Sequence, residues 1–281
     1  MSDGSILITG CSSGIGFQVA QGLRARGWRV FATARQPADV TRLQADGLES
    51  LALDLRDSAS IQTAVTAVLE RTGGRLDALF NNGAYGQPGA VEDLSREALR
   101  EQFETNLFGT LELTNRLIPV MRRQGGGRIL FNSSVLGLVA FPYRGAYVAS
   151  KFALEGLADT LRLELTGTGI HVCLIEPGPI LSRFRDNAHA AYRQHIRAED
   201  SPHREKYAAM ETRLRKQGPA APFTLLPEAV LKRVIHALES PRPKTRYPVT
   251  LPTYFFAVLR RLLPTRALDA ILRRAGGEGR R

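Results

Sequence analysis

A tyrosine and a lysine stand four residues apart in the segment YRGAYVASK, at Tyr147 and Lys151. On a helix, this spacing places both side chains on one face. An unperturbed phenol has a pKa of about 10 and is a poor acid at neutral pH, but a nearby ammonium stabilises the phenolate and lowers that pKa. Because a general acid works best near the operating pH, the pair predicts a catalytic tyrosine tuned by a lysine. A solvated helix face is the alternative.

The other tyrosine of this segment is Tyr143. It precedes Gly145, where the helix is expected to begin, and no lysine follows it one turn later. We therefore predict that Tyr143 packs in the wall of a pocket or against a lid and takes no part in the chemistry.

A glycine-rich turn, TGCSSGIG, lies between the first strand-like run and the first helical segment. Gly10, Gly14 and Gly16 permit a tight turn, close approach of the backbone to a pyrophosphate, and packing of helix on strand. The helix N-terminus supplies free N–H groups and a positive dipole end for phosphates. This placement predicts a dinucleotide site rather than a structural turn.

The end of the second strand-like run indicates which dinucleotide binds. It reads FATAR, with Ala34 and Arg35 and no carboxylate. An acidic residue at this place usually receives the ribose hydroxyls of NAD, whereas an arginine accommodates the 2′-phosphate of NADP. We predict NADP(H), with Arg35 pairing the phosphate and Ser13 as a second contact. Since 33 of the 38 basic residues are Arg, an ordinary solvated Arg35 is the alternative.

Asp54 follows the third strand-like run, in ALDLRD. Its carboxylate could accept a hydrogen bond from the adenine amino group. It could equally cap the helix expected to begin near Ser58.

These residues need a scaffold that brings strand ends together. Helical periodicity separates short apolar, β-branched runs, and such alternation forms right-handed crossovers and a parallel sheet covered on both faces. A chain of 281 residues with 43% hydrophobic content can bury one large core. The sequence therefore predicts a single α/β domain with a doubly wound parallel sheet. The predicted strands are 6–9, 29–33, 50–53, 78–80, 127–132, 170–175 and 246–249, and the predicted helices are 14–26, 38–45, 58–71, 95–123, 145–166 and 227–239.

The segment 181–218 interrupts this alternation. It is polar, rich in Arg and His, and directly follows the end of a predicted strand. Ligands of open α/β sheets bind outside the carboxyl ends of the strands. We therefore predict a substrate lid at 181–218, within a catalytic domain at 1–250.

The basic charge of the chain is concentrated in its tail. Of the net charge of +11, residues 232–281 contribute +9, from 12 Lys and Arg against 3 Asp and Glu. The main domain shows neither a basic face nor a nucleic-acid reading motif, so no nucleic-acid partner is predicted. The basic amphipathic segment 251–281 is too short and too charged to span a bilayer. It could lie on an anionic membrane surface, or pack on its own domain or a second subunit.

The remaining composition predicts a cytoplasmic protein without a metal site. The first strand begins almost at Met1, which leaves no room for a signal peptide, although the tail could hold the protein at the inner membrane surface. Cys11 and Cys173 are far apart and should be packed thiols, and the five histidines have no ligand spacing. The final GGEGRR is expected to be disordered.

The motifs together resemble the short-chain dehydrogenase/reductase family. TGCSSGIG matches its TGxxxGxG, while TNLFG, FNSSVLG and YVASK contain its Asn, Ser, Tyr and Lys in the family's order. EPGPILS looks like the segment under the nicotinamide. Within the family, ITGCSSGIG, RGAY, ASKFALEG, IEPGPI and RYPVTL look most like bacterial NADP-dependent aldehyde reductases, and more distantly like retinol and 17β-hydroxysteroid dehydrogenases.

The resemblance implies a Rossmann-like three-layer α/β/α fold, NADP(H), and interconversion of a carbonyl and an alcohol. It implies that Ser134, thirteen residues before Tyr147, donates to the substrate oxygen; Ser133 is a similar hydroxyl, and only the spacing selects Ser134. Lys151 also holds the nicotinamide ribose, and Asn106 holds a water that links Lys151 to solvent. The predicted catalytic residues are Asn106, Ser134, Tyr147 and Lys151. With the residues argued above, the predicted cofactor-binding residues are Gly10, Ser12, Ser13, Gly14, Ile15, Gly16, Arg35, Asp54, Leu55, Asn82, Gly83, Tyr147, Lys151, Pro177, Gly178, Ile180 and Ser182.

Two positions depart from the family pattern. The usual NNAG reads NNGA at 81–84, so the small residues are transposed. The usual Thr after the PG segment is Ser182, which keeps a hydroxyl.

The predicted function is the reduction of an aldehyde or ketone by NADPH, or the reverse oxidation of an alcohol. A non-catalytic NADP(H)-binding sensor is the alternative, although such proteins typically lose the Tyr or the Lys. A homodimer or homotetramer is expected by resemblance. An apolar substrate, such as a medium- or long-chain aldehyde, retinal or a steroid, is predicted from the apolar residues between Ser134 and Tyr147, which are Leu136, Leu138, Val139, Phe141 and Pro142.

Overall fold

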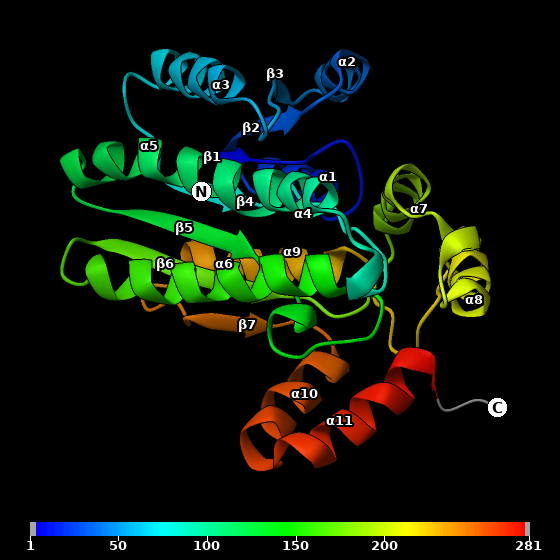
Figure 1. The fold of residues 1–281 in the computed structure, drawn as a ribbon. Coiled ribbons are helices and arrows are strands. Elements are labelled where there is room, and N and C mark those ends of the chain that lie inside the picture. The colour runs from blue at the N-terminus through cyan, green and yellow to red at the C-terminus, as the bar shows by residue number, and fades with distance from the viewer. Residues whose placement is uncertain (1–3, 279–281) are drawn as a thin grey trace.

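The computed structural model describes residues 4–278 of the chain, which form seven parallel strands with helices on both faces (Figure 1). The sheet order is β3-β2-β1-β4-β5-β6-β7. Each predicted strand is present, with ends within one residue of the prediction, so the doubly wound fold is confirmed. The strands are β1 (Ser5–Ile8), β2 (Arg29–Ala34), β3 (Glu49–Ala52), β4 (Ala78–Asn81), β5 (Gly127–Asn132), β6 (Ile170–Glu176) and β7 (Arg246–Pro248).

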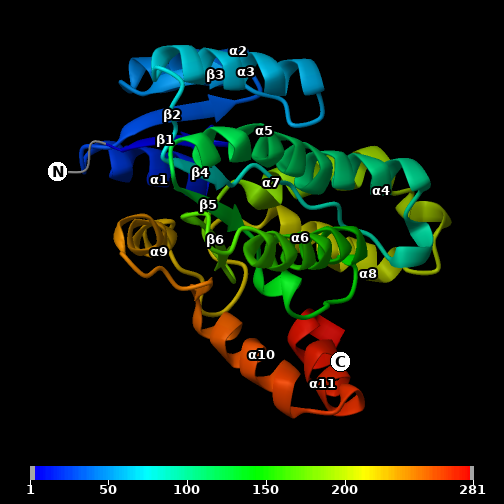
Figure 2. The ribbon, with the colours of Figure 1, turned by 90° about the vertical axis from the view of Figure 1, so that its left-hand side faces the viewer.

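The helices make the two outer layers (Figure 2). Each predicted helical segment is helical, and the predicted lid and tail contain two further helices each. The α-helices are α1 (Gly14–Arg24), α2 (Pro37–Ala45), α3 (Ser58–Arg71), α4 (Arg96–Phe103), α5 (Gly109–Arg123), α6 (Gly145–Glu164), α7 (Phe184–His195), α8 (Arg204–Arg215), α9 (Glu228–Glu239), α10 (Leu251–Leu262) and α11 (Thr265–Arg273). Short 3-10 turns are η1 (Val91–Asp93), η3 (Val135–Gly137) and η4 (Ala198–Asp200), and π turns are η2 (Glu104–Phe108) and η5 (Arg274–Glu278).

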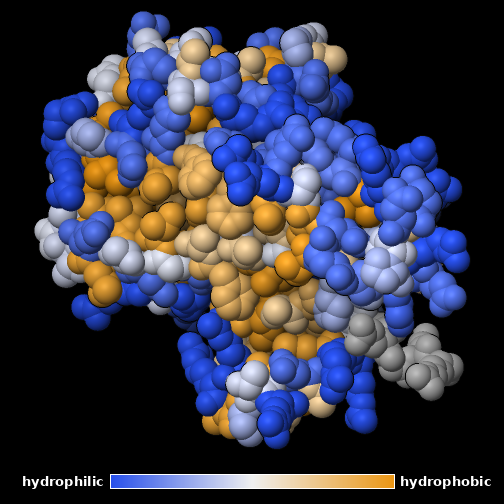
Figure 3. Space-filling view, viewed as in Figure 1, coloured by the Kyte–Doolittle hydropathy of each residue, from blue (hydrophilic) through white to orange (hydrophobic). Residues whose placement is uncertain are grey.

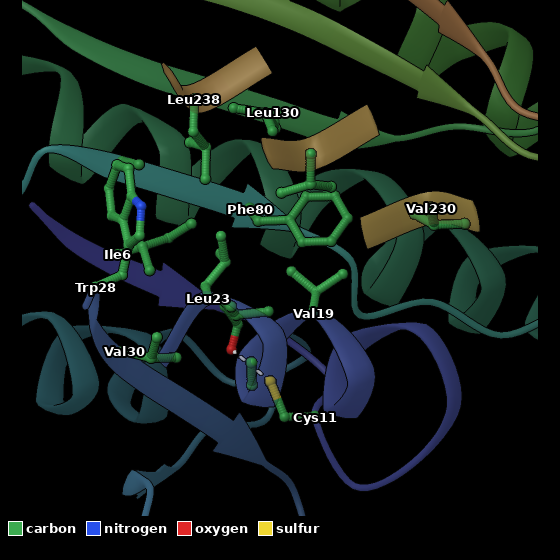
Figure 4. Close-up of a cluster of buried hydrophobic side chains, with 14 of the residues drawn as sticks. Ile6, Cys11, Val19, Leu23, Trp28, Val30, Phe80, Leu130, Val230 and Leu238 are labelled. Atoms are coloured by element: carbon green, nitrogen blue, oxygen red, sulfur yellow. Dashed lines mark hydrogen bonds between the residues drawn. The ribbon is translucent and has the colours of Figure 1, made fainter. Parts of the chain in front are cut away.

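Two apolar cores hold the layers together. One lies between the sheet and helices α1 and α9, where Val19, Leu23 and Val230 meet Phe80 (Figure 4). The other lies on the opposite face, under α3, α5 and α6. Strands covered on both faces carry continuous apolar runs, such as Ile6 to Ile8 in β1, because each successive side chain enters one core or the other. Cys11 and Cys173 are buried free thiols, as predicted.

The predicted helix 95–123 is not one regular α-helix. The π turn η2 separates α4 from α5, so the prediction of an unbroken helix is wrong at 104–108. The backbone is held close here: a β-carbon on Gly109 would lie 1.7 Å from the carbonyl oxygen of Leu55. A π turn adds a residue to one turn of a helix and often marks a functional site.

The tail forms a C-terminal hairpin, α10 and α11, that extends from one end of the body (Figures 1 and 2). Its buried residues Phe256 and Leu272 pack against Val135, Leu136 and Val139. Packing on its own domain, one of the two predicted alternatives, is therefore observed. Of the GGEGRR end that was expected to be disordered, residues 276–278 belong to the π turn η5, and residues 279–281 lie outside the described part.

Candidate active site

The predicted site residues gather at one edge of the sheet, because the carboxyl ends of parallel strands meet there. The order of strands reverses between β1 and β4, and their loops pack closely: a β-carbon on Gly10 would lie 2.7 Å from the α-carbon of Gly83. Asn82 donates to the carbonyls of Thr9 at 2.8 Å and Gly10 at 3.1 Å. The transposed NNGA loop thus braces the glycine-rich turn at the switch point where ligands of such sheets bind.

The glycine-rich turn has the backbone that a phosphate site requires. Gly10 and Gly14 have φ of 70° and 58°, which side chains other than glycine rarely adopt. A β-carbon on Gly16 would lie 2.3 Å from the carbonyl oxygen of Gly10. Ser13 is the N-cap residue of α1, and its side chain makes no capping hydrogen bond. Ser12 and Ile15 complete the loop, so the N–H groups of the first turn can receive an anion.

The residues after β2 and β3 lie next along this edge. Arg35 is exposed and makes no hydrogen bond or ion pair with any residue from 4 to 278. Its charge helps to lower the pKa of Asp54, against the effect of burial. Asp54 accepts from the backbone and guanidinium of Arg56, and Leu55 follows it beside Gly83. The helix cap is Asp57, which accepts from Ala59 N–H at 2.9 Å, so the capping alternative for Asp54 is wrong.

Tyr147 stands in the first turn of α6, facing the loop after β5. Ser134 is the N-cap residue of η3, two residues beyond the end of β5, and it lies close enough to Tyr147 to act on the pKa of that phenol. The oxygen of Ser134 accepts the N–H of Leu136 at 3.1 Å, which leaves its hydroxyl proton available to donate. Ser133 instead faces Glu155 and Gly137. The structure thus separates two serines that only the spacing had distinguished.

The pKa of Tyr147 differs from the sequence expectation. Burial raises it to about 12, and Ser134 alone acts in the lowering direction. Lys151 Nζ lies 5.6 Å from the centre of the Tyr147 ring, but burial also lowers the pKa of Lys151 to about 8. For the polypeptide by itself, the predicted lowering by Lys151 is wrong, because desolvation of the phenolate outweighs an ammonium that is itself desolvated.

Lys151 is held in place by the end of β5. Its buried Nζ donates to the carbonyl of Asn132 at 2.7 Å. The side chain of Asn132 in turn donates to Asn82 at 2.9 Å. A continuous set of hydrogen bonds therefore runs from Lys151 through Asn132 and Asn82 to the glycine-rich turn.

Asn106 lies in the π turn η2 and is buried. Its Oδ1 accepts from Tyr85 N–H at 3.1 Å, and its Nδ2 donates to the Tyr85 carbonyl at 2.9 Å and to Ser150 Oγ at 3.1 Å. Asn106 thus reaches the neighbour of Lys151 rather than Lys151 itself.

The segment after β6 closes the site from the other side. The carbonyl of Pro177 accepts from Val135 N–H at 2.8 Å, and a β-carbon on Gly178 would lie 2.0 Å from Thr250 Oγ1. Ile180 pairs with Leu225. Ser182 lies against the glycine-rich turn, because a β-carbon on Gly14 would be 2.8 Å from Ser182 Cβ.

The predicted lid segment contacts Tyr147. Phe184, the first residue of α7, packs edge-on against Tyr147 with ring centres 5.3 Å apart. Tyr143 packs on the same segment, with its hydroxyl 3.2 Å from His203 Nδ1 and its ring against Tyr207. The prediction that Tyr143 is a lid-packing aromatic is confirmed.

Two hollows of about 280 and 620 Å³, around Arg75 and Arg213 respectively, contain none of the predicted site residues.

Two residues of the site were not predicted. Arg42 of α2 donates to the carbonyl of Ser12 at 2.5 Å, beside the glycine-rich turn, and Phe184 covers Tyr147. Arg42 lies in the helix that follows Arg35, and its contact with Ser12 depends on how α2 packs beside the glycine-rich turn, so no local signal marked it. For Phe184 no local signal existed, since its contact depends on how the lid folds back.

Comparison with known proteins agrees with this arrangement. The family model for short chain dehydrogenases matches residues 5–193. The uncharacterized oxidoreductase YbbO of Escherichia coli is 45% identical over 268 residues, which cover 95% of this chain and 93% of that protein.

Two solved structures share the fold. A short chain dehydrogenase/reductase of Burkholderia phymatum in complex with NAD is 26% identical, with a TM-score of 0.77, covering 97% of this chain and 95% of that chain. A variant of actinorhodin polyketide ketoreductase with NADPH is 28% identical, with a TM-score of 0.72, covering 88% of this chain and 95% of that chain. The sequence match over two thirds of the chain and the shared fold lead to one conclusion: this chain is a member of the short-chain dehydrogenase/reductase family of oxidoreductases.

Proposed function

We propose that the protein reduces an apolar aldehyde or ketone with NADPH, or oxidises the corresponding alcohol. The observation that carries this proposal is the position of Tyr147, which lies beside Ser134 in the first turn of α6 and one helical turn from Lys151. The same edge of the sheet carries a glycine-rich turn with uncapped N–H groups. The proposed acid, Tyr147, therefore lies next to a hydroxyl that can orient the substrate oxygen, Ser134, and on the same edge of the sheet as the proposed dinucleotide site.

The residues act on the carbonyl oxygen in defined ways. With a pKa of about 12, Tyr147 is a neutral phenol at pH 7 and can donate its proton to that oxygen. Ser134 donates a second hydrogen bond, which orients the oxygen and stabilises its developing charge. Lys151 can return a proton toward Tyr147, since its pKa of about 8 lies close to neutrality. Bound NADPH would supply the hydride, and the positive charge of its oxidised ring would favour the phenolate.

The residues present fit a dinucleotide phosphate. Gly10, Gly14 and Gly16 leave no room for β-carbons, and the α1 N-terminus is free of a side-chain cap. NADP rather than NAD is proposed from the end of β2, where Arg35 is exposed and unpaired among residues 4–278 and no carboxylate follows the strand. Arg42, on the same side of the turn, also pairs with Asp39 at 2.9 Å, so Arg35 is the proposed contact with the 2′-phosphate.

The surroundings of Tyr147 support an apolar substrate. Tyr147 belongs to an apolar cluster with Leu136, Val139 and Phe141, three of the five residues predicted to border the pocket. Phe256 of the C-terminal hairpin joins the same cluster, and Phe184 adds another ring. A polar substrate would lose hydration here without gaining partners.

We further propose a homodimer or homotetramer. Apolar side chains gather on the face formed by α5 and α6 (Figure 3), where Phe108, Phe152, Leu157 and Leu163 are exposed. Exposed apolar patches of this kind commonly mark protein interfaces. Light scattering of the purified protein measures the assembly directly.

The test of the reaction is Tyr147→Phe against Tyr143→Phe. The first removes the proposed acid and should lower turnover of medium- and long-chain aldehydes, retinal or ketosteroids by roughly 10²-fold or more, while NADPH affinity stays nearly unchanged. The matched control removes only a hydroxyl that contacts His203 and should keep most activity. Retained turnover by Tyr147→Phe would refute the acid role.

The alternative, a cofactor-binding sensor, predicts a different result. Wild-type protein would bind NADPH tightly and turn over no member of the panel. Both Tyr147 and Lys151 are present and buried in the arrangement described, and no feature of the site favours the sensor.

A further inference from the structure

The outward face of α10 is apolar and uncovered. Leu251, Phe255, Val258 and Leu262 are 61%, 52%, 52% and 72% exposed. Their spacing of four, three and four residues places them on one helical stripe, and exposed Tyr254 lies beside it. Scattered exposed apolar residues are ordinary, but a continuous stripe marks a surface that meets something.

The opposite face of the hairpin is already used. Phe256 and Leu272 are buried against η3, with Leu259, Leu268 and Ile271 packed around them. The hairpin is therefore anchored to the body through its inner face. Its outer stripe cannot turn inward without exposing this cluster, so the stripe is a fixed external surface.

Arginines surround this surface. Residues 251–274 contain Arg260, Arg261, Arg266, Arg273 and Arg274, all exposed, against one carboxylate, Asp269. Figure 3 shows the outer rim of the hairpin as mainly hydrophilic, next to the apolar centre of that view. An apolar stripe with a basic margin fits a partner that is apolar within and anionic at its surface.

This charge pattern argues against a second copy as the occupant. In a symmetric dimer the same patch faces itself. Arg260 lies over the ring of Phe152 on α6, and the other four arginines of the hairpin would approach their own copies with one Asp on each side to pair them. A spanning role is also excluded for the described helices, since none of those within residues 4–278 is both long and apolar enough to cross a bilayer. We propose that the C-terminal hairpin docks on an anionic phospholipid surface through this stripe.

Docking would also bring the lipid phase to the substrate site. The inner face of the hairpin shares its apolar cluster with Tyr147 and Val148. An apolar substrate dissolved in the lipid would thus have a short apolar path to the tyrosine. This step rests on the proposed function, whereas the docking itself does not.

The experiment is cosedimentation of the full-length protein with vesicles. Phosphatidylcholine vesicles that contain phosphatidylglycerol should bind wild type, binding should weaken with salt, and pure phosphatidylcholine should bind it much less. The double variant Phe255→Glu, Val258→Glu changes only exposed side chains and should lower partitioning roughly tenfold or more. Leu226→Glu, a change at a residue that is 58% exposed outside the hairpin, should bind as wild type does. Arg261→Gln with Arg266→Gln should remove much of the salt dependence.

Three results would overturn the proposal. Wild type could fail to bind anionic vesicles, or the double variant could bind as well as wild type. The double variant could also reduce the oligomeric state while vesicle binding stays unchanged, which would assign the stripe to a second copy. Circular dichroism of each variant checks the fold, and water-soluble short aldehydes assay the reaction separately from docking.

Discussion

At the residue scale, burial by the polypeptide sets the protonation state of Tyr147. The polypeptide buries the phenol and holds its pKa at about 12, so the acid form dominates over the whole physiological range. That state suits proton donation to a carbonyl. The reverse direction needs the phenolate, which a bound oxidised nicotinamide would favour by its charge.

The proposed preference for NADPH over NADH rests on Arg35. Arg35→Asp replaces an exposed cation by the carboxylate that NAD sites present at this place. Loss of one charge-assisted contact costs about 1.5–3 kcal/mol, so the ratio of kcat/KM for NADPH to that for NADH should fall roughly tenfold or more. Steady-state rates with both cofactors measure it. Arg122→Asp makes the same change in charge at an exposed position at the end of α5 and should leave the ratio alone. If Arg35→Asp left the ratio of kcat/KM values unchanged, another residue would determine cofactor selectivity, and Arg42 would be the next one to test.

Residue identities at this site could be predicted, but their electrostatics could not. Ser134 and Tyr147 meet because β5 ends just before Ser134 and α6 begins just before Tyr147, and both boundaries are visible in the sequence. The pKa of Tyr147 depends on burial, to which residues distant in sequence contribute, including Phe184. The position of the neighbouring lysine could be predicted from local sequence, but the desolvation that raises the pKa of Tyr147 could not.

The π turn η2 is the clearest departure at the element scale. A helical pattern at 95–123 predicts one helix, because a single extra residue in one turn barely disturbs the periodicity. The departure places Asn106 inward, where it fixes the backbone of Tyr85. The ends of the strands were predicted within one residue because their apolar runs are local signals. Helices α7 and α8 were not predicted, because the lid segment has mixed polarity.

Gly109 tests the contact that accompanies this turn. Gly109→Ala would place a β-carbon 1.7 Å from the carbonyl oxygen of Leu55, so backbone must shift, and overpacking of this kind costs about 1–3 kcal/mol. Gly156→Ala is the matched control, because it lies inside α6 with nothing within 4 Å of the added carbon. The control should instead stabilise the protein by up to about 1 kcal/mol. Urea unfolding measures whether each variant has a lower or a higher free energy of unfolding than wild type. Equal effects would mean that helix propensity alone matters at Gly109.

One charge cluster joins three elements and concerns the stability of the whole molecule. Arg246 of β7 pairs with Glu176 of β6 at 2.6 Å, with Asp159 of α6 at 2.6 Å, and with Glu155 of α6. Glu155 and Glu176 are both buried, so one cation faces two desolvated carboxylates. Burial and the neighbouring Glu155 raise the pKa of Glu176 from 4.5 to about 7, although Arg246 acts in the opposite direction.

This raised pKa sets a pH dependence of folding. An unfolded Glu176 releases its proton near pH 4.5, whereas the folded protein retains it until about pH 7. The folded state therefore binds more protons between these values, and its stability falls as the pH rises through that window. Between pH 5.5 and 8, the titration of Glu176 should lower the free energy of unfolding by roughly 2 kcal/mol.

Glu176→Gln should remove that contribution. Its free energy of unfolding should change less between pH 5.5 and 8 than that of wild type, because the amide cannot titrate while Arg246 keeps Asp159 and Glu155. Urea denaturation at both pH values gives the difference. The control is Glu239→Gln, which removes an exposed carboxylate whose pKa Arg26 lowers, so its titration lies below this window and the wild-type slope should persist. If Glu176→Gln retained the full wild-type slope, the proton would reside on Glu155, the other buried carboxylate that faces Arg246, and Glu155→Gln should then flatten the profile.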